Sequence, residues 1–310
     1  MNLQSTVYRV RKKEARESCP VTAVQGAGSL AVLVVLLISV SGCAKERGVE
    51  QKHSVLFVSL DTVRADALGC YGSKSARTPT IDGLAGAGVL FEDAMCQAPA
   101  TGPSFASIMT SKYPQNCGVL HSTMVLPDTQ HTLAEEFKAR GYRTGAFVSC
   151  SILKSKYGFS QGFDVYDETF TRHYSESEVE RDAADTTRAL TRWLAMEPGA
   201  PFFAWVHYFD PHAPYRRRAT SQLDEELGTY AFLRKLEESQ SLDKLKEALP
   251  SIKALYDDEV AYVDRQIGKV LETLERAGMR NDTLIVVAAD HGEELFDHHF
   301  FHGHFASLYD

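Results

Sequence analysis

The chain contains 310 residues, of which 44% are hydrophobic and 24% are charged, a composition typical of a globular protein. This length allows one large α/β domain or two small ones. The formal net charge is −8, so the chain lacks the basic excess typical of nucleic-acid-binding domains, and we expect no nucleic-acid partner.

Residues 1–42 are typical of a bacterial lipoprotein signal. Basic residues at positions 9–16 precede an apolar run at 30–40, and small residues lead into Cys43. A transmembrane anchor is the alternative, but the run is short for crossing a bilayer. We therefore expect residues 43–53 to be a tether. Lipid on Cys43 would hold the protein on a membrane of the bacterial cell envelope, outside the cytoplasm.

The first predicted strand, residues 54–60, is an apolar run that ends at Asp61-Thr62. A helix is expected to begin near Thr78, and the apolar residues 88–91 predict a short strand.

A second helix is predicted to begin around Thr101-Gly102-Pro103. Proline suits the first helical position, which places Thr101 or Gly102 near the cap. Free amides and the helix dipole at this end attract anions such as sulfate or phosphate, so Thr101 has a place to act as a nucleophile. The alternative is an ordinary threonine cap.

The middle of the chain alternates between helix and strand. Residues 132–139 and 175–196 are predicted helices, and residues 142–149 and 201–209 are predicted strands. His207, Asp210 and His212 cluster where the second of these strands ends. A single histidine would be a structural hydrogen-bonding group by default, but two with an aspartate beside prolines favour a functional site.

Residues 216–250 are charged and predicted to form a helical surface insertion, and residues 252–277 have the apolar spacing of a long amphipathic helix. The alternation of strands and helices predicts an α/β fold with a largely parallel, mixed sheet between helices. Residues 54–310 would form this domain.

The last predicted strand, residues 284–289, has six apolar residues in a row and is expected to be covered on both faces. It ends at Asp290-His291, which could be a plain polar turn. Parallel sheets bind ligands beyond the carboxyl ends of their strands, and the strand before Asp61 ends in the same way. We therefore expect Asp61, Asp290 and His291 to bind one divalent metal ion, with Thr101 completing the shell.

Two further groups of residues have less specific patterns. Four histidines lie at positions 298, 299, 302 and 304, a density too high for core residues alone. Cys70, Cys96, Cys117 and Cys150 have no spacing that resembles a metal knuckle, and a role as small buried hydrophobic residues is at least as consistent with the sequence.

Several segments together resemble the sulfatase family of the alkaline-phosphatase-like superfamily, from about Val55 to the last residue. They are Leu60–Asp66 with Gly72, Thr78–Asp82, Pro103-Ser104 with Ala106-Ser107, Asp210–His212, Tyr256–Val260 and Asp290–Glu293. The resemblance implies the N-terminal domain of that fold, a mixed sheet between helices. The family usually has a smaller C-terminal subdomain that this chain does not reach, so a truncated chain is expected.

The resemblance also implies roles for individual residues. Asp61, Asp290 and His291 match metal-ligand positions, and Thr101 matches the nucleophile. His212 matches a histidine that contacts the sulfate group or the leaving oxygen. The other expected substrate contacts are His207, His302 and His304, the last two near a substrate-binding lysine of the family. Calcium is the metal that the resemblance implies, whereas the His291 and Thr101 pattern would favour zinc or manganese.

The chain departs from the family at the nucleophile. Sulfatases oxidise a cysteine or serine to formylglycine within a motif that also contains proline and arginine. Thr101 stands at that position, and oxidation of threonine would give a ketone instead of an aldehyde. Phe105 replaces the arginine, and Thr62 replaces the usual second aspartate.

Three functions are therefore open. The first is a sulfatase-type hydrolase of sulfate esters, acting on a glycan or an aryl alcohol. The second is a phosphoester hydrolase or phosphoethanolamine-type transferase on the same scaffold, in which Thr101 attacks phosphorus directly. The third is an inactive lipoprotein that binds sulfated or phosphorylated glycans.

Overall fold

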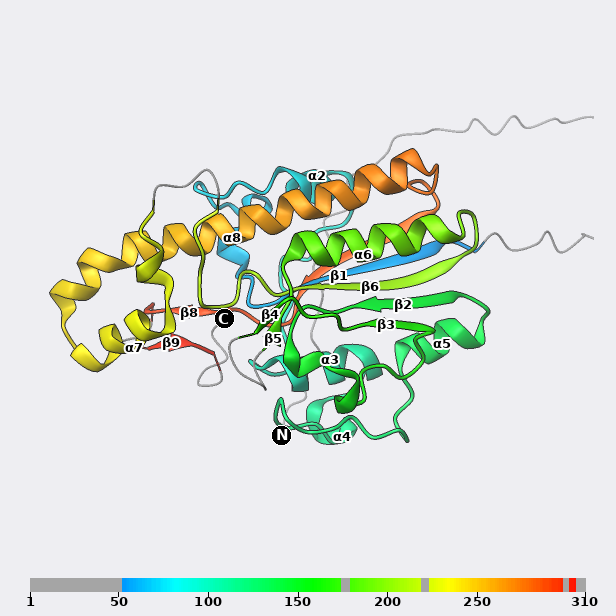
Figure 1. Ribbon diagram of the computed structural model, residues 1–310, viewed down its shortest axis with the longest axis horizontal. Helices are drawn as coiled ribbons and strands as arrows, with labels where there is room; N and C mark the ends of the chain where they lie inside the picture. Colours follow the sequence, from blue (N-terminus) through cyan, green and yellow to red (C-terminus); the bar gives the residue numbers. More distant parts are fainter. Residues whose placement is uncertain (1–51, 174–178, 219–222, 298–300, 305–310) are drawn as a thin grey trace, which may run out of the picture. The chain divides into compact units, whose positions relative to one another are not determined.

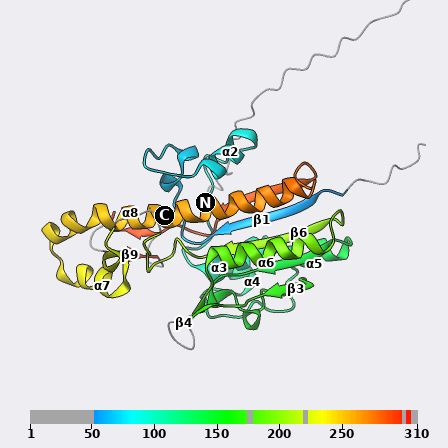
Figure 2. The ribbon, with the colours of Figure 1, turned by 45° about the horizontal axis from the view of Figure 1, so that its top comes forward.

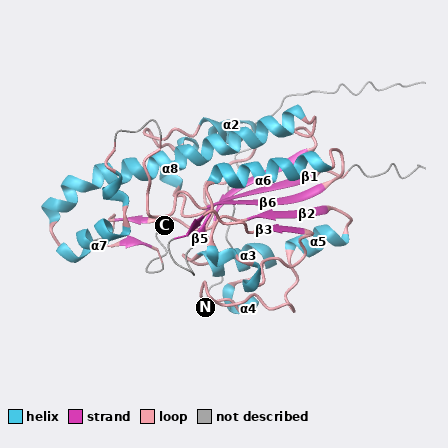
Figure 3. Ribbon diagram, viewed as in Figure 1, coloured by secondary structure: helices cyan, strands magenta, loops and turns pink. Residues whose placement is uncertain are grey.

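A five-stranded parallel sheet forms the centre of the computed structural model, which describes residues 52–173, 179–218, 223–297 and 301–304. Its strands, in spatial order, are β3 (Val165–Asp167), β2 (Arg143–Phe147), β6 (Phe202–Tyr208), β1 (Ser54–Leu60) and β7 (Thr283–Ala289). Every pairing in this sheet is parallel. The predicted α/β fold with a largely parallel sheet is confirmed (Figure 3).

Helices cover both faces of the sheet (Figure 1). One face carries α6 (Ala183–Met196) and α8 (Leu242–Arg276), with α2 (Pro79–Ala87) packed against α8, as Figure 2 also shows. The other face carries α3 (Thr101–Thr110), α4 (Pro114–Cys117) and α5 (Leu133–Ala139). Alternate residues of β1 enter two separate cores, Leu56 and Val58 on the first face and Phe57 on the second, as the period of a strand requires.

The remaining elements are short. They comprise α7 (Tyr230–Ser239), the strand pairs β4 (Arg172–His173) with β5 (Val179–Glu180) and β8 (Glu294–Leu295) with β9 (His302–Gly303), and the 3-10 helices η1 (Ala65–Ala67), η2 (Gly69–Tyr71), η3 (Ser151–Leu153), η4 (Ser155–Tyr157) and η5 (Glu225–Gly228).

The strand register brings two distant segments together. Leu60, the last residue of β1, pairs with Tyr208 of β6 on one side and with Ala289 of β7 on the other. Asp61 and Asp290 therefore leave the sheet side by side at the same edge, where parallel sheets bind ligands.

Two predictions about apolar segments are wrong. β7 is the edge strand of the described sheet, and the side chains of Leu284 and Val286 are 59% and 40% exposed, so within the described residues it is not covered on both faces. Residues 88–91 form no strand beyond a single bridge residue at Phe91, and Val89 and Phe91 are about half exposed. An apolar run alone does not supply the pairing partner that a strand needs.

Two helix boundaries also differ from the prediction. The helix expected from residue 175 begins at Ala183, because Asp182 accepts a hydrogen bond from the amide of Ala184 and caps it. The helix expected from residue 252 already begins at Leu242 and passes through Pro250. A proline inside a helix costs about 3 kcal/mol. Burial of the face formed by Leu245, Ala248 and Ile252 offsets this cost.

Residues 1–51 lie outside the described part of the chain, so the signal, most of the tether and lipid on Cys43 stay predictions. His298 and His299 also fall outside it. Among the helices that the structure describes, none combines the length and apolar character needed to cross a membrane.

Candidate active site and metal centre

The predicted metal ligands lie together at the carboxyl ends of β1 and β7. Asp61, Asp290 and His291 each offer a ligand atom, and these atoms lie within 4.8 Å of one another. All three side chains are buried. Asp61 Oδ1 and Asp290 Oδ2 have no hydrogen-bond partner among the described residues. Two adjacent buried carboxylates with unpaired oxygens are costly, and this donor set fits a divalent metal ion.

The charges of the cluster are strongly coupled. Burial raises the pKa of Asp61, but the hydrogen bond and charge of His207 and the nearby His212 and His291 outweigh it, so the pKa falls to about 2. Burial and the charge of Asp61 raise the pKa of Asp290 to about 6. Burial alone would lower the pKa of His291. The charges of Asp290 and Asp61 outweigh this effect, so the pKa is raised above its usual value. A cation bound here would add positive charge and stabilise both aspartates as anions.

Thr101 faces this cluster from the start of α3. The helix begins at Thr101 with Ala100 at the N-cap, and no side chain makes a capping hydrogen bond. Thr101 Oγ1 instead lies 3.4 Å from His291 Nε2. The alternative that Thr101 is an ordinary cap is therefore wrong, and Pro103 occupies the third helical position rather than the first.

The start of α3 is held in place by close contacts. The amide of Gly102 donates to Ser122 Oγ at 3.3 Å, and a Cβ atom on Gly102 would lie 2.6 Å from the Cα atom of Ser122, so only glycine fits. Ser104 Oγ donates to the carbonyl oxygen of Asp290 at 2.6 Å, which ties the helix to the ligand loop. Since Ser122 takes the Gly102 amide and Pro103 has none, the helix end offers fewer anion-binding amides than expected.

Two of the predicted histidines join the cluster. The ring of His304 lies 4.6 Å from that of His291 and 5.0 Å from that of His212. His304 Nδ1 also lies 3.3 Å from Glu293 Oε1. Burial lowers the pKa of His212, which favours its neutral form. The ring of His304 thus contacts those of both His291 and His212.

His302 and His207 have other partners. His302 Nε2 is 2.9 Å from the hydroxyl of Tyr215. His207 has no exposed surface, and its Nε2 lies 3.1 Å from Asp61 Oδ2. The substrate contact predicted for His207 does not suit this position, because the ring is enclosed and its polar partner is a metal-ligand candidate.

Two side chains that connect the ligand loops, those of Tyr256 and Arg64, had no role predicted from the sequence, although both lie in segments that carried the family resemblance. The hydroxyl of Tyr256 on α8 donates to the carbonyl oxygen of Thr62 at 2.8 Å and accepts from the amide of Arg64 at 2.9 Å. Arg64 donates in turn to the carbonyl oxygen of Glu293. These bonds connect the segment after Asp61 to the segment after Asp290.

The segment after Asp61 needs this support because Thr62 has φ of 56°, a left-handed conformation that is unfavourable for a β-branched residue. The amide of Thr62 also donates to Asp290 Oδ1 at 3.3 Å. Tyr256 and Asp290 therefore hold Thr62 in place.

Replacement of Tyr256 by phenylalanine should weaken metal binding. The change leaves the Thr62 carbonyl and the Arg64 amide without their buried partner, which should lower stability by about 1–3 kcal/mol and metal affinity by about 10–100-fold. Calorimetric titration with divalent ions measures the affinity. Tyr208→Phe is the matched control, because the Tyr208 hydroxyl is equally buried but bonds to Thr187. Equal affinities in both variants would contradict the bracing role of Tyr256.

Asp210, predicted to be functional, belongs to a buried ionic cluster. Arg218 contacts Asp210, Asp182 and Glu259, so it ties the loop that carries His212 to α6 and α8. Burial raises the pKa of Asp210 to about 6 and that of Glu259 to about 8, although Arg218 acts in the opposite direction. Arg172 also pairs with Asp182, so two arginines face three carboxylates, and the raised pKa of Glu259 favours its protonated form.

This retained proton predicts a pH dependence of stability. The unfolded chain releases the Glu259 proton near pH 4.3, whereas the folded chain holds it to about pH 8. The free energy of unfolding should therefore fall as pH rises through this window. Urea unfolding at several pH values should show a smaller fall for Glu259→Gln than for the wild type. Glu272→Gln, on an exposed position of the same helix, should leave the fall unchanged, and an identical fall in all three proteins would contradict the prediction.

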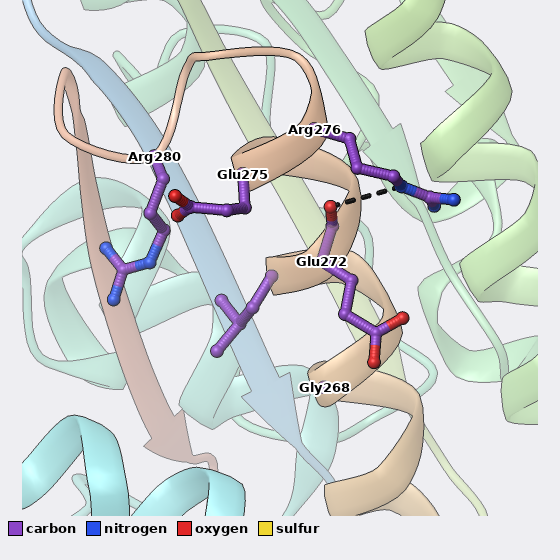
Figure 4. Close-up of a pocket in the computed structure, with 6 residues that line it drawn as sticks. Gly268, Glu272, Glu275, Arg276 and Arg280 are labelled. Atoms are coloured by element: carbon purple, nitrogen blue, oxygen red, sulfur yellow. Dashed lines mark hydrogen bonds between the residues drawn. The ribbon is translucent and has the colours of Figure 1, made fainter.

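A surface hollow of about 450 Å³ lies between the end of α8 and the start of β7 (Figure 4). Glu272, Glu275, Arg276 and Arg280 line it. It is at the amino end of β7, whereas Asp290 follows the carboxyl end, so it is separate from the metal cluster.

The parallel α/β sheet has an acidic and imidazole cluster at its strand ends, an arrangement that the alkaline-phosphatase-like class of fold shares. The chain belongs to the sulfatase family, whose sequence profile matches residues 53–310. The ulvan-active sulfatase of Formosa agariphila is 25% identical over 321 residues, which cover 94% of this chain and 60% of that protein. Human iduronate 2-sulfatase is 26% identical over 306 residues, which cover 79% and 56%.

Solved structures share the fold. The phosphonate monoester hydrolase of Agrobacterium radiobacter has a TM-score of 0.65 at 22% identity, covering 81% of this chain and 65% of that one. A protein solved with its substrate D-glucosamine-2-N,6-O-disulfate has a TM-score of 0.62 at 20% identity, covering 83% and 68%. The chain spans about 60% of the length of the curated relatives named above. Family membership implies a divalent metal, for which the Asp61, Asp290 and His291 cluster supplies fitting ligands.

Proposed function

We propose that this protein is a metal-dependent hydrolase of sulfate esters. The observation that carries the proposal is the position of Thr101 Oγ1, 3.4 Å from His291 Nε2, beside the Asp61, Asp290 and His291 cluster in a chain of the sulfatase family. The named relatives include sulfatases acting on ulvan and iduronate, which supports a sulfated glycan as substrate.

The residues divide the chemistry between them. A bound divalent ion supplies positive charge that favours ionisation of a nearby hydroxyl and neutralises charge on the attacked group. Asp61, Asp290 and His291 would hold that ion, and Thr101 presents its hydroxyl for attack. His212 and His304 lie within about 5 Å of each other beside His291, where they can bind the anion and protonate the leaving oxygen.

The second candidate is phosphoester hydrolysis or phosphoethanolamine-type transfer, and Thr101 favours it. Threonine cannot become the aldehyde of formylglycine. The arginine of the modification motif is replaced by Phe105, which is fully buried and packs against Trp205 with ring centroids 5.1 Å apart. Direct attack by a hydroxyl on phosphorus gives a phosphothreonine that water can hydrolyse. The fold shared with a phosphonate monoester hydrolase is compatible with this chemistry.

Parallel turnover assays separate these functions. Full-length protein is incubated with an aryl sulfate, an aryl phosphate monoester and a phosphodiester, each with calcium, zinc or manganese. Fastest turnover of the sulfate supports the first function, and fastest turnover of a phosphate ester supports the second. If no substrate turns over while sulfated glycans bind, the inactive glycan-binding alternative holds. The same assays identify the metal. Highest activity with calcium would follow the sulfatase pattern, and highest activity with zinc or manganese would follow the pattern of His291 and Thr101.

We also propose that the protein is anchored in the bacterial cell envelope by lipid on Cys43, because a basic, apolar and small-residue sequence precedes this cysteine. Mass spectrometry of the membrane fraction tests the anchor. An unmodified chain that begins upstream of Cys43 would contradict it.

A further inference from the structure

A second cluster of ligand-type side chains shares Asp61 with the first. Cys150 follows β2, His207 lies near the end of β6, and Asp61 follows β1, so three adjacent strands supply one residue each. Ligand atoms of the three residues lie within 4.8 Å of one another. All three side chains are at most 1% exposed. The cluster is therefore inside the protein and needs partners of its own.

The polar atoms of this cluster are not fully paired. His207 Nε2 meets Asp61 Oδ2 at 3.1 Å, but His207 Nδ1 and Asp61 Oδ1 have no hydrogen-bond partner among the described residues. The neighbouring ring is that of Phe105, with its centroid 5.3 Å away, which offers no acceptor. An imidazole enclosed completely with one nitrogen unpaired is costly unless another group binds in the cluster.

The donor types indicate what that group is. A thiolate, an imidazole and a carboxylate are the three side chains that bind zinc, whereas calcium and magnesium prefer oxygen alone. Ligand atoms around a tetrahedral zinc ion are roughly 3.5 Å apart, so small side-chain movements from the present positions are sufficient. We propose that Asp61, Cys150 and His207 form a second cation site, selective for zinc-class ions, in which Asp61 bridges to the first site.

The site explains two features together. It would provide a partner for the enclosed His207, and it would place a second cation beside Asp61. The competing explanation is ordinary packing, in which His207 only orients Asp61 and Cys150 is a small buried residue. The two explanations differ in one observable property, namely sulfur coordination.

Cobalt(II) titration of the metal-stripped full-length protein measures this property, because a thiolate ligand gives a sulfur-to-cobalt charge-transfer absorption and oxygen or nitrogen ligands do not. The wild type should bind a second equivalent of cobalt and show this absorption. Cys150→Ser should lose the second equivalent of cobalt and the absorption, and it should still bind the first equivalent of cobalt. Cys117→Ser is the control, because Cys117 is equally buried but lies in α4 with its thiol directed to the carbonyl oxygen of Pro114.

A variant of the first site completes the design. Asp290→Asn should lose the cobalt ion of the first site and keep the sulfur-to-cobalt absorption of the second. Loss of one site would then be distinguished from loss of the other. X-ray absorption of the zinc-loaded wild type requires no variant to fold and should show a sulfur ligand at about 2.3 Å. A first shell of only nitrogen and oxygen, or an absorption that persists in Cys150→Ser, would overturn the proposal.

Discussion

Replacement of Thr101 by alanine should abolish turnover, with a fall in kcat of at least about a thousandfold. The variant removes the hydroxyl that lies 3.4 Å from His291 Nε2 and leaves the helix start intact, because Thr101 makes no capping bond. Stability should change by only about 1 kcal/mol. Steady-state kinetics on the best substrate and thermal unfolding measure the two effects.

Thr101→Ser is the matched control for this prediction. Serine keeps the hydroxyl and loses only the methyl group, so it should retain part of the activity. Thr101→Cys should not become an efficient sulfatase, because Phe105 still replaces the arginine of the modification motif. Wild-type turnover in Thr101→Ala would show that the nucleophile is another group, such as water.

Replacement of Asp290 by asparagine should remove the stabilisation that metal binding at the Asp61, Asp290 and His291 site gives, together with activity. Burial and the charge of Asp61 raise the pKa of Asp290 to about 6, so at neutral pH the metal-free wild type holds two unfavourably close anions. Asparagine removes one charge and keeps the oxygen that accepts from the amides of Thr62 and His291. The metal-free variant should therefore be no less stable than the metal-free wild type. Any gain in its free energy of unfolding should not exceed about 1–3 kcal/mol.

Thermal unfolding with chelator and with added metal tests this prediction. The wild type should gain more stability with metal than Asp290→Asn, which keeps at most the second site. Asp257→Asn is the control, because burial also raises the pKa of Asp257 but its carboxylate bonds to Ser75, apart from the cluster. A variant that is destabilised without metal and still responds fully to metal would contradict the assignment of Asp290.

The strands that place the site were predictable because their patterns are local. Residues 54–60 and 284–289 are apolar runs followed at once by Asp61 and Asp290, and the ends of parallel strands meet at one edge. The exposure of β7 was not predictable in this way. An apolar run does not reveal whether its strand is central or at an edge, since this depends on the order of all strands.

The roles of the histidines depended on tertiary contacts. The dense run that includes His302 and His304 indicated a functional segment, but only the fold shows that His304 reaches His291 while His302 packs against Tyr215. The cluster of Asp61, Cys150 and His207 had no sequence signal, because its members come from three strands and the spacing of cysteines reveals only local metal knuckles.

Direct attack by Thr101 is tested most directly by mass spectrometry of peptides from protein quenched in acid during the first turnover of its best substrate. We expect a sulfo or phospho group on Thr101 and on no other residue, because the hydroxyl attacks directly and the group is then hydrolysed. The same group on a different residue, or product formation in the first turnover with Thr101 unmodified throughout, would contradict it.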